Sequence, residues 1–407
     1  MSIGSAHKWS PKLVGVVLLA FCVSAQARTD VTFWESPVNS KLNSIEVSEI
    51  AQDGSGALWF ATQEGLTRQR GEAVDIFTAA NVSVGGLKPG GVKALAVSSK
   101  GHLWVLTRSL QVFNPETQRF DTPIALPSDM NPSSLAFDNE DRLWMGLEGS
   151  IALYRPGLGV PELIELPQTT VLKLGNEVRA STIVKLLPLG DLMIGVNSEA
   201  IFEFQIDRGG IVRIKELAAL SANNAPIVAS TAAIHENSVF VGTIYGGLIT
   251  LDLKTGSLSR TTEGPDDDDL PSNLITTVLS DDSGVWLGTQ NGLVLTEDGG
   301  RTFQYYGDTF TGLPSNWIVG LYKSSDGSYW VGTRAGLAQG AQTQFDAFNA
   351  SNSNLSHNHV NAVHQTSDGT IWVGTQDGLS RLAPGETRFR WVNTANTPEL
   401  RSNQIMS

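Results

Sequence analysis

The chain has almost no cysteine and, beyond its first residues, no long hydrophobic run. Cys22 is the only cysteine among 407 residues, so no disulfide can form within the chain. No later stretch approaches the roughly 18 uninterrupted apolar residues of a membrane-spanning helix. Basic residues are also scarce, since 28 Lys and Arg against 41 Asp and Glu give a net charge of −13. This charge argues against nucleic acid or an anionic membrane surface as a partner, because both attract basic patches.

The first residues indicate a signal peptide that spans 1–27. A basic start precedes an apolar stretch, 13–23, that is too short to cross a bilayer. Ala25-Gln26-Ala27 then supplies the small-x-small site of a signal peptidase, and we expect cleavage directly after it. A lipid anchor on Cys22 is the alternative, but Phe21 is too bulky for the position before a lipidated cysteine. We therefore expect an exported, periplasmic protein.

What the chain has in abundance is one repeated phrase. It reads Ile-Trp-Val-Gly-Thr-Gln-Asp-Gly-Leu at 371–379 and returns in similar form at 329–337, 285–293 and 58–66. With four looser copies, its bulky position falls at Trp59, Trp104, Trp144, Met193, Phe240, Trp286, Trp330 and Trp372. Successive positions lie 40 to 49 residues apart, which is the spacing of β-propeller blades.

Each repeat accounts for four short antiparallel strands. In the last full copy, 360–365 alternates between two faces, and Asp-Gly pairs at 368–369 and 377–378 mark tight hairpins. The fourth strands echo one another in the pairs Phe303 and Tyr305, Phe345 and Phe348, and Phe389 and Trp391. We predict an all-β propeller over 28–407. It has eight four-stranded blades, or seven if the eighth repeat begins a second ring.

The residues of the phrase are best explained as scaffold. The Trp offers a large flat face that fills the wedge between blades. The Gly two residues on (Gly288, Gly332, Gly374) permits close approach of neighbouring chain, and the Thr after it suits a strand end where its hydroxyl satisfies backbone groups. Aromatic residues at a fixed strand position are usually core, so the phrase indicates architecture and not chemistry.

The terminal segment, 400–407, begins another blade. It repeats the Ser-Asn-x-Ile entry phrase found at 315–318, where a new blade starts. Either this segment closes the ring by pairing with the early strand around 31–34, or the chain is part of something longer. An unpaired strand edge would promote aggregation, so some pairing is expected. We favour the longer protein.

The phrase Trp-x-Gly-Thr-x-x-Gly-Leu, with its Ser-Asn-x-Ile entry and Asp-Gly turn, resembles the two-component regulator propeller repeat. The resemblance covers nearly all of 40–407. It implies the periplasmic sensor part of a hybrid histidine kinase or diguanylate cyclase, ahead of a membrane helix and an output domain. It also implies a small-molecule partner, a carbohydrate breakdown product among the candidates.

Ligands of propellers bind at the mouth of the central channel, where the loops enter the innermost strands. Trp317 and His359 occupy the same position in two of these entry loops, each next to an asparagine. An aromatic ring beside an amide suits stacking on and hydrogen bonding to a sugar-like ligand. We predict Asn316, Trp317, Asn358 and His359 as ligand-binding residues. The alternative is that Asn316 and Asn358 cap their own turns.

No metal, cofactor or catalytic residue is predicted. His357 and His359 share a strand face, but His364 lies an odd number of residues away, and a catalytic zinc needs three protein ligands. The acidic run 266–269 lacks the spaced loop of a calcium site. Residues 297–303 resemble the Asp-box turn of sialidase-like propellers, without a nucleophile pair.

Two other functions stay open. Antibiotic-opening lyases also use propellers, and such an enzyme would need His359 as its base and an acid partner that the sequence does not identify. A stand-alone secreted propeller could instead be a protein-interaction scaffold.

Overall fold

The structure, a computed structural model, describes residues 31–405 apart from 81–85, 128–129, 156–158, 168–170, 175–176, 207–211, 221–226, 267, 308–311, 343–347, 349, 387 and 399. The predicted signal peptide, 1–27, lies outside the described residues. None of the helices in the described part of the chain is both long and apolar enough to span a membrane.

Six four-stranded antiparallel sheets, blades 1 to 6, follow one another along the chain. Blades 1 to 3 are β2 (Glu49–Gln52), β3 (Leu58–Thr62), β4 (Gly65–Arg70), β5 (Ala73–Thr78); β6 (Ala94–Val97), β7 (Leu103–Leu106), β8 (Leu110–Asn114), β9 (Arg119–Asp121); and β10 (Ser134–Phe137), β11 (Leu143–Gly146), β12 (Ser150–Tyr154), β13 (Glu162–Glu165). Blades 4 to 6 are β16 (Lys185–Leu189), β17 (Leu192–Val196), β18 (Ala200–Ile206), β19 (Val212–Ala219); β20 (Ala229–His235), β21 (Ser238–Thr243), β22 (Leu248–Asp252), β23 (Leu258–Thr261); and β24 (Ile275–Asp281), β25 (Gly284–Thr289), β26 (Gly292–Thr296), β27 (Gln304–Tyr306). A two-stranded hairpin, β14 (Val171–Leu174) and β15 (Glu177–Ala180), interrupts the connection between blades 3 and 4.

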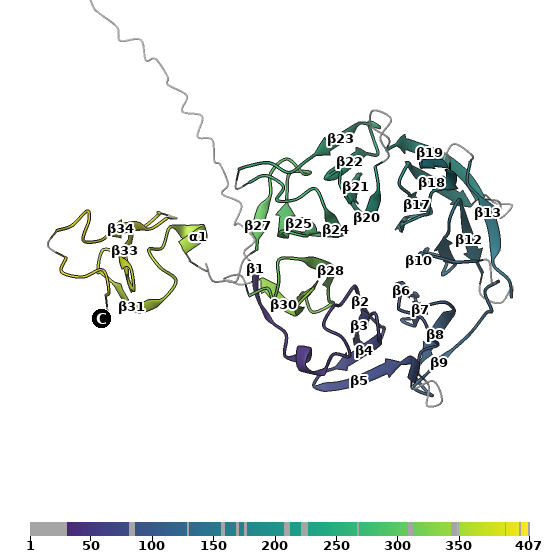
Figure 1. The fold of residues 1–407 in the computed structure, drawn as a ribbon, viewed down its shortest axis with the longest axis horizontal. Coiled ribbons are helices and arrows are strands. Elements are labelled where there is room, and N and C mark those ends of the chain that lie inside the picture. The colour runs from purple at the N-terminus through teal and green to yellow at the C-terminus, as the bar shows by residue number, and fades with distance from the viewer. Residues whose placement is uncertain are drawn as a thin grey trace, which may run out of the picture.

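Blade 7 is completed by the start of the described chain. It contains β28 (Ile318–Lys323), β29 (Tyr329–Thr333), β30 (Gly336–Gln342) and, at its outer edge, β1 (Val31–Glu35). A short 3-10 helix, η1 (Pro37–Lys41), then leads from β1 toward blade 1. The inner strands β2, β6, β10, β16, β20, β24 and β28 contact one another in sequence, and β28 contacts β2. Figure 1 shows the resulting closed ring of seven blades.

The closing strand is held by backbone pairing and by aromatic packing. Val31 lies opposite Gln342 in the antiparallel register of β1 and β30. Phe33 is buried and packs edge-on against Trp286 and Tyr306 of blade 6, with ring centroids 6.3 and 5.8 Å apart. The ring is therefore not closed by the terminal segment 400–407, and that sequence-based alternative is wrong.

The prediction of a fourth strand around Phe345 and Phe348, made from the recurring aromatic pairs, was also wrong for blade 7. β1 occupies the place of that strand, on the free side of β30. Phe345 lies outside the described residues. The ring of Phe348 packs instead against Phe389, with centroids 5.5 Å apart. Phe348 thus belongs with the sheet that follows blade 7.

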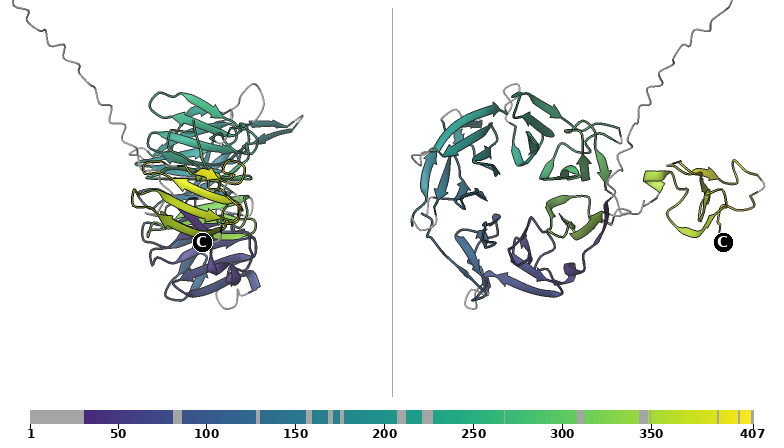
Figure 2. Two further views of the ribbon diagram at one scale, coloured as in Figure 1. Left: turned by 90° about the vertical axis from the view of Figure 1, so that its left-hand side faces the viewer. Right: turned by 180° about the vertical axis from the view of Figure 1, so that it is seen from behind.

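An eighth four-stranded sheet follows α1 (Ala350–Ser353) and comprises β31 (Val360–Gln365), β32 (Ile371–Thr375), β33 (Gly378–Leu382) and β34 (Arg390–Val392). Figures 1 and 2 show it outside the ring. It has its own small core, which includes Leu355, Val373 and Phe389. The all-β propeller of four-stranded blades is confirmed. The eight repeats correspond to seven ring blades and one sheet outside the ring.

The Trp residues of the phrase fill the space between blades and also make hydrogen bonds. Trp59 and Trp144 are buried, and their indole N–H groups donate to Asp53 Oδ2 and Asp138 Oδ2, each at 2.7 Å. These aspartates lie in the turn before each Trp strand. A buried indole N–H without a partner would cost about 1–3 kcal/mol, so the turn aspartate and the Trp form one structural unit.

The Gly of the phrase makes room for the next entry strand. A Cβ on Gly288 would lie 2.7 Å from Cγ2 of Ile318, which is the first residue of the following blade. A Cβ on Gly374 would lie 2.7 Å from Cγ2 of Ile405, whose N–H donates to the Thr375 carbonyl at 3.0 Å. Ile405 therefore holds, on the eighth sheet, the position that Ile318 holds on blade 6.

Replacing Gly288 by alanine should destabilise the ring by about 1–3 kcal/mol, because the added methyl group would lie only 2.5 Å from Thr277 Cγ2 and 2.7 Å from Ile318 Cγ2. The measurement is urea-induced unfolding followed by tryptophan fluorescence. Gly91→Ala is the control, since a Cβ there would meet its nearest neighbour, Gln63 O, at an ordinary 3.5 Å. Equal losses of stability in the two variants would contradict the packing role of Gly288.

Candidate functional site

One end of each blade carries the loops that could form a binding site. The chain enters each inner strand at this end, and the turn between the second and third strands also lies there. The two are hydrogen-bonded to each other, as where Arg334 N–H donates to the Trp317 carbonyl at 3.1 Å and Gln290 N–H to the Leu274 carbonyl at 3.3 Å. We call this end of the ring the entry face. It is the end where the sequence predicted ligand binding.

Trp317 and Arg334 form a stacked pair on the entry face of blade 7. Trp317 directly precedes β28, and Arg334 begins the turn between β29 and β30. The guanidinium carbon of Arg334 lies 3.4 Å from the centroid of the Trp317 ring. Trp317 is half-buried and Arg334 is exposed. The exposed guanidinium, placed by this stack, offers a positive charge and paired N–H donors, which suit a carboxylate.

The sequence analysis missed Arg334 because it stands at a variable position of the phrase. Blades 1 and 6 and the eighth sheet carry glutamine there, as Gln63, Gln290 and Gln376. One feature of the sequence could have identified Arg334. Blade 7 has a charged residue where these three repeats have glutamine, and it is also the repeat with a Trp in its entry loop.

The other predicted residues are placed differently. Asn316 adjoins Trp317, and its carbonyl accepts from Gly292 N–H at 2.8 Å. Asn358 and His359 precede β31, so they lie on the eighth sheet, outside the ring (Figure 1). Asn358 Oδ1 accepts from Ala350 N–H at 2.7 Å, which ties the entry loop of the eighth sheet to the first residue of α1. The structure brings Asn316 together with Trp317 and Asn358 together with His359, but it does not bring the two pairs together.

A charged pair crosses the centre of the ring. Glu49 is the first residue of β2 in blade 1, and Lys185 is the first residue of β16 in blade 4. Lys185 Nζ lies 4.0 Å from Glu49 Oε1. The N–H of Leu95, on the next inner strand, donates to Glu49 Oε2 at 2.6 Å. These residues are far apart in sequence, and only ring closure brings them together.

Burial raises the pKa of Glu49 above its ordinary value, while Lys185 and the Leu95 N–H act in the opposite direction. The side chain is 32% accessible. The carboxylate lies between residues of the inner strands of blades 2 and 4, and desolvation is the larger effect on its pKa.

A cavity of about 700 Å³ opens between blades 2, 3 and 4. Its lining residues come mainly from the loop into β10, the β11–β12 turn and β13, and they are Lys93, Pro127, Met130, Asn131, Pro132, Ser133, Leu147, Glu148, Ser150, Pro161, Leu163 and Thr182. None of them was predicted from the sequence.

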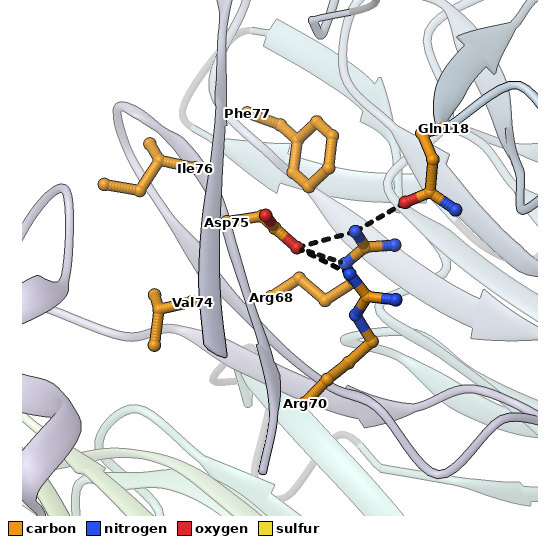
Figure 3. A pocket seen from close by; sticks show the side chains of 7 residues that line it. All are labelled: Arg68, Arg70, Val74, Asp75, Ile76, Phe77 and Gln118. Atoms are coloured by element: carbon orange, nitrogen blue, oxygen red, sulfur yellow. Dashed lines mark hydrogen bonds and ion pairs between the residues drawn. The ribbon is translucent and has the colours of Figure 1, made fainter. Parts of the chain in front are cut away.

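Figure 3 shows a second hollow, of about 550 Å³, beside Arg68 and Asp75. Arg68 is 4% exposed and donates to Asp75 Oδ2 from Nε at 3.1 Å and from Nη2 at 2.6 Å. Nη2 also donates to Gln118 Oε1 of blade 2 at 2.6 Å, and the guanidinium lies over the rings of Trp59 and Phe113. The hydrogen bond from Arg68 lowers the pKa of Asp75. These contacts tie blade 1 to blade 2, so we assign this hollow a structural role.

The family model described as "Two component regulator propeller" matches residues 312–335 and 354–377. The chain carries two-component regulator propeller repeats. The matched segments hold the entry loop and Trp-Gly-Thr strand of blade 7 and of the eighth sheet, so the resemblance inferred from the phrase is confirmed. No curated protein matches the chain in sequence.

Solved structures share the fold at low sequence identity. The extracellular domain of the hybrid two component system BT4673 from B. thetaiotaomicron is 17% identical with a TM-score of 0.56, over 92% of this chain and 49% of that one. The chain thus spans about half the length of that relative. A virginiamycin B lyase from Staphylococcus aureus is 10% identical with a TM-score of 0.56, over 77% of this chain and 99% of that one. PorZ of Porphyromonas gingivalis is 17% identical with a TM-score of 0.54, over 89% and 56%.

Replacing Glu49 by glutamine should remove a component of the pH dependence of stability. Because the pKa of Glu49 is higher in the folded than in the unfolded state, wild-type stability falls as pH rises from the ordinary carboxyl value through the raised one. Glutamine still accepts from Leu95 but cannot ionise. Urea midpoints between about pH 4 and 8 should decline more steeply for wild type than for Glu49→Gln. Glu116→Gln, at an exposed turn, should follow wild type, and identical slopes for all three proteins would refute the assignment.

Proposed function

We propose that the chain is the ligand-sensing module of an exported bacterial signalling receptor, with no catalysis of its own. The receptor would be of the two-component or cyclic-di-GMP type, and the module would precede its transmembrane and output domains. The proposal is supported by the two-component regulator propeller repeats and by the shared fold of the B. thetaiotaomicron extracellular domain. The observation that carries it is the Trp317–Arg334 stack, an aromatic ring and an exposed cation on the entry face of a closed ring.

The chemistry of this pair favours a carbohydrate-derived ligand that bears a carboxylate. The half-buried Trp317 ring offers apolar surface to a sugar ring, and Asn316 lies next to it in the entry loop. Arg334 presents paired N–H donors whose spacing matches the two oxygens of a carboxylate. A neutral sugar would use only the first of these contacts. We therefore propose Asn316, Trp317 and Arg334 as the ring's ligand-binding residues, with Asn358 and His359 as a separate candidate on the eighth sheet.

Two features weigh against the lyase alternative. It required His359 as a base at the ring centre, but His359 belongs to the eighth sheet. The two histidines in the described part of the ring, His102 and His235, lie at the end of the blades opposite the entry face, in or beside the turns between first and second strands. A catalytic base for that reaction would therefore have to be another kind of side chain.

Calorimetric titration of residues 28–407 with uronic-acid oligosaccharides and their neutral counterparts tests the proposal. Arg334→Gln introduces the residue that other repeats carry, and it should weaken uronate binding roughly 10- to 100-fold, since a hydrogen bond to a charged group contributes about 1.5–3 kcal/mol. Neutral saccharides should lose little. Trp317→Ala should weaken both classes.

Arg108→Gln is the matched control, because Arg108 holds the same turn position in blade 2. It should leave every affinity unchanged. Equal affinities of wild type, Trp317→Ala and Arg334→Gln for all saccharides would contradict the proposed site.

A further inference from the structure

The cavity between blades 2, 3 and 4 differs in chemistry from the Trp317–Arg334 pair. None of the described residues that line it is aromatic. The apolar part of its walls is aliphatic and includes Met130, the buried Leu147 and Leu163, which is 56% exposed. Sugars in protein sites generally need flat apolar faces, whereas aliphatic walls suit aliphatic side chains. The volume, about 700 Å³, is that of a typical small-ligand pocket.

Most of the uncharged polar groups in the cavity are already used by the protein. Ser133 Oγ donates to the Gly146 and Ile183 carbonyls at 3.1 and 2.7 Å. Ser150 Oγ donates to the Glu148 carbonyl at 3.4 Å. The groups left to fix the orientation of a ligand are therefore chiefly the two charged side chains of the lining, Lys93 and Glu148.

The two charges are held by different blades. Lys93 directly precedes β6, and its Nζ donates to Asn131 Oδ1 at 2.5 Å, a contact that turns the ammonium toward the loop of blade 3. Glu148 lies in the β11–β12 turn, where its backbone forms a β-bridge with Thr182 of the blade 4 entry. Both side chains are exposed. One cation from blade 2 and one anion from blade 3 thus lie in the lining of the cavity.

We infer that this cavity binds a short apolar peptide with free termini. The peptide carboxylate would meet the Lys93 ammonium, and the peptide ammonium would meet the Glu148 carboxylate. Its aliphatic side chains would cover Met130, Leu147 and Leu163. An uncapped peptide is a zwitterion with an apolar body, and it is the simplest ligand that satisfies both charges and the walls together. This site is independent of the saccharide site proposed on blade 7.

The test is titration of residues 28–407 with trileucine, followed by calorimetry and by the midpoint of thermal unfolding. Binding should raise the midpoint, as expected for a ligand specific to the folded state. Triglycine should bind at least tenfold more weakly than trileucine, because it has no side chains to cover the aliphatic walls. Lys93→Gln and Glu148→Gln should each weaken trileucine binding about tenfold or more. Lys100→Gln and Glu116→Gln, which change exposed charges in turns at the opposite end of blade 2, should not.

Capped peptides make the assignment specific. Trileucine amide lacks the carboxylate, so its affinity should be insensitive to Lys93→Gln, whereas N-acetyl-trileucine should be insensitive to Glu148→Gln. This crossed pattern is a double-mutant cycle between protein and ligand. Absence of trileucine binding at millimolar concentration, or binding that Trp317→Ala abolishes and Lys93→Gln does not, would overturn the inference.

Discussion

The antiparallel pairing of β1 with β30 is the constraint on which the rest of the structure depends. A ring of sheets must join its two ends, and here the first described strand becomes the outer strand of the last blade. Without it, β30 would present an open strand edge, which invites non-native pairing. Val31 and Phe33 are buried in the process, and side chains of this size contribute roughly 1.5–3 kcal/mol each. The closing strand therefore fixes the ring at seven blades and leaves the eighth sheet outside.

Closure also creates the chemistry of the entry face. Glu49 and Lys185 meet only because blades 1 and 4 are held on opposite sides of one centre. The Leu95 N–H, on the unpaired inner edge of β6, gains the Glu49 carboxylate as a partner. The cavity between blades 2, 3 and 4 and the Trp317–Arg334 stack occupy separate sectors of the same face. The two proposed sites thus differ in chemistry and lie on one ring.

Much of the fold could be predicted because the repeat encodes local geometry. The strand alternation, the Asp-Gly turns and the small residue against which Ile318 packs are all visible in a single copy of the phrase. The early strand 31–34 was considered for ring closure, but its pairing with β30 could not be predicted, since β1 carries no copy of the phrase and Phe348 resembles the fourth-strand aromatics of other repeats. The site was only partly predictable. Trp317 stood out as an aromatic at a polar position, but the contacts of Arg334 and of Glu49 depend on how blades are placed in space.

The most direct test of this account is the stability of the ring without its closing strand. Cooperative thermal unfolding of residues 37–407 should be compared with that of residues 28–407, with tryptophan fluorescence as the signal. Loss of Val31 and Phe33 should lower the free energy of unfolding by roughly 3–6 kcal/mol and expose the edge of β30. A shortened chain with an unchanged midpoint and no tendency to associate would contradict closure by β1.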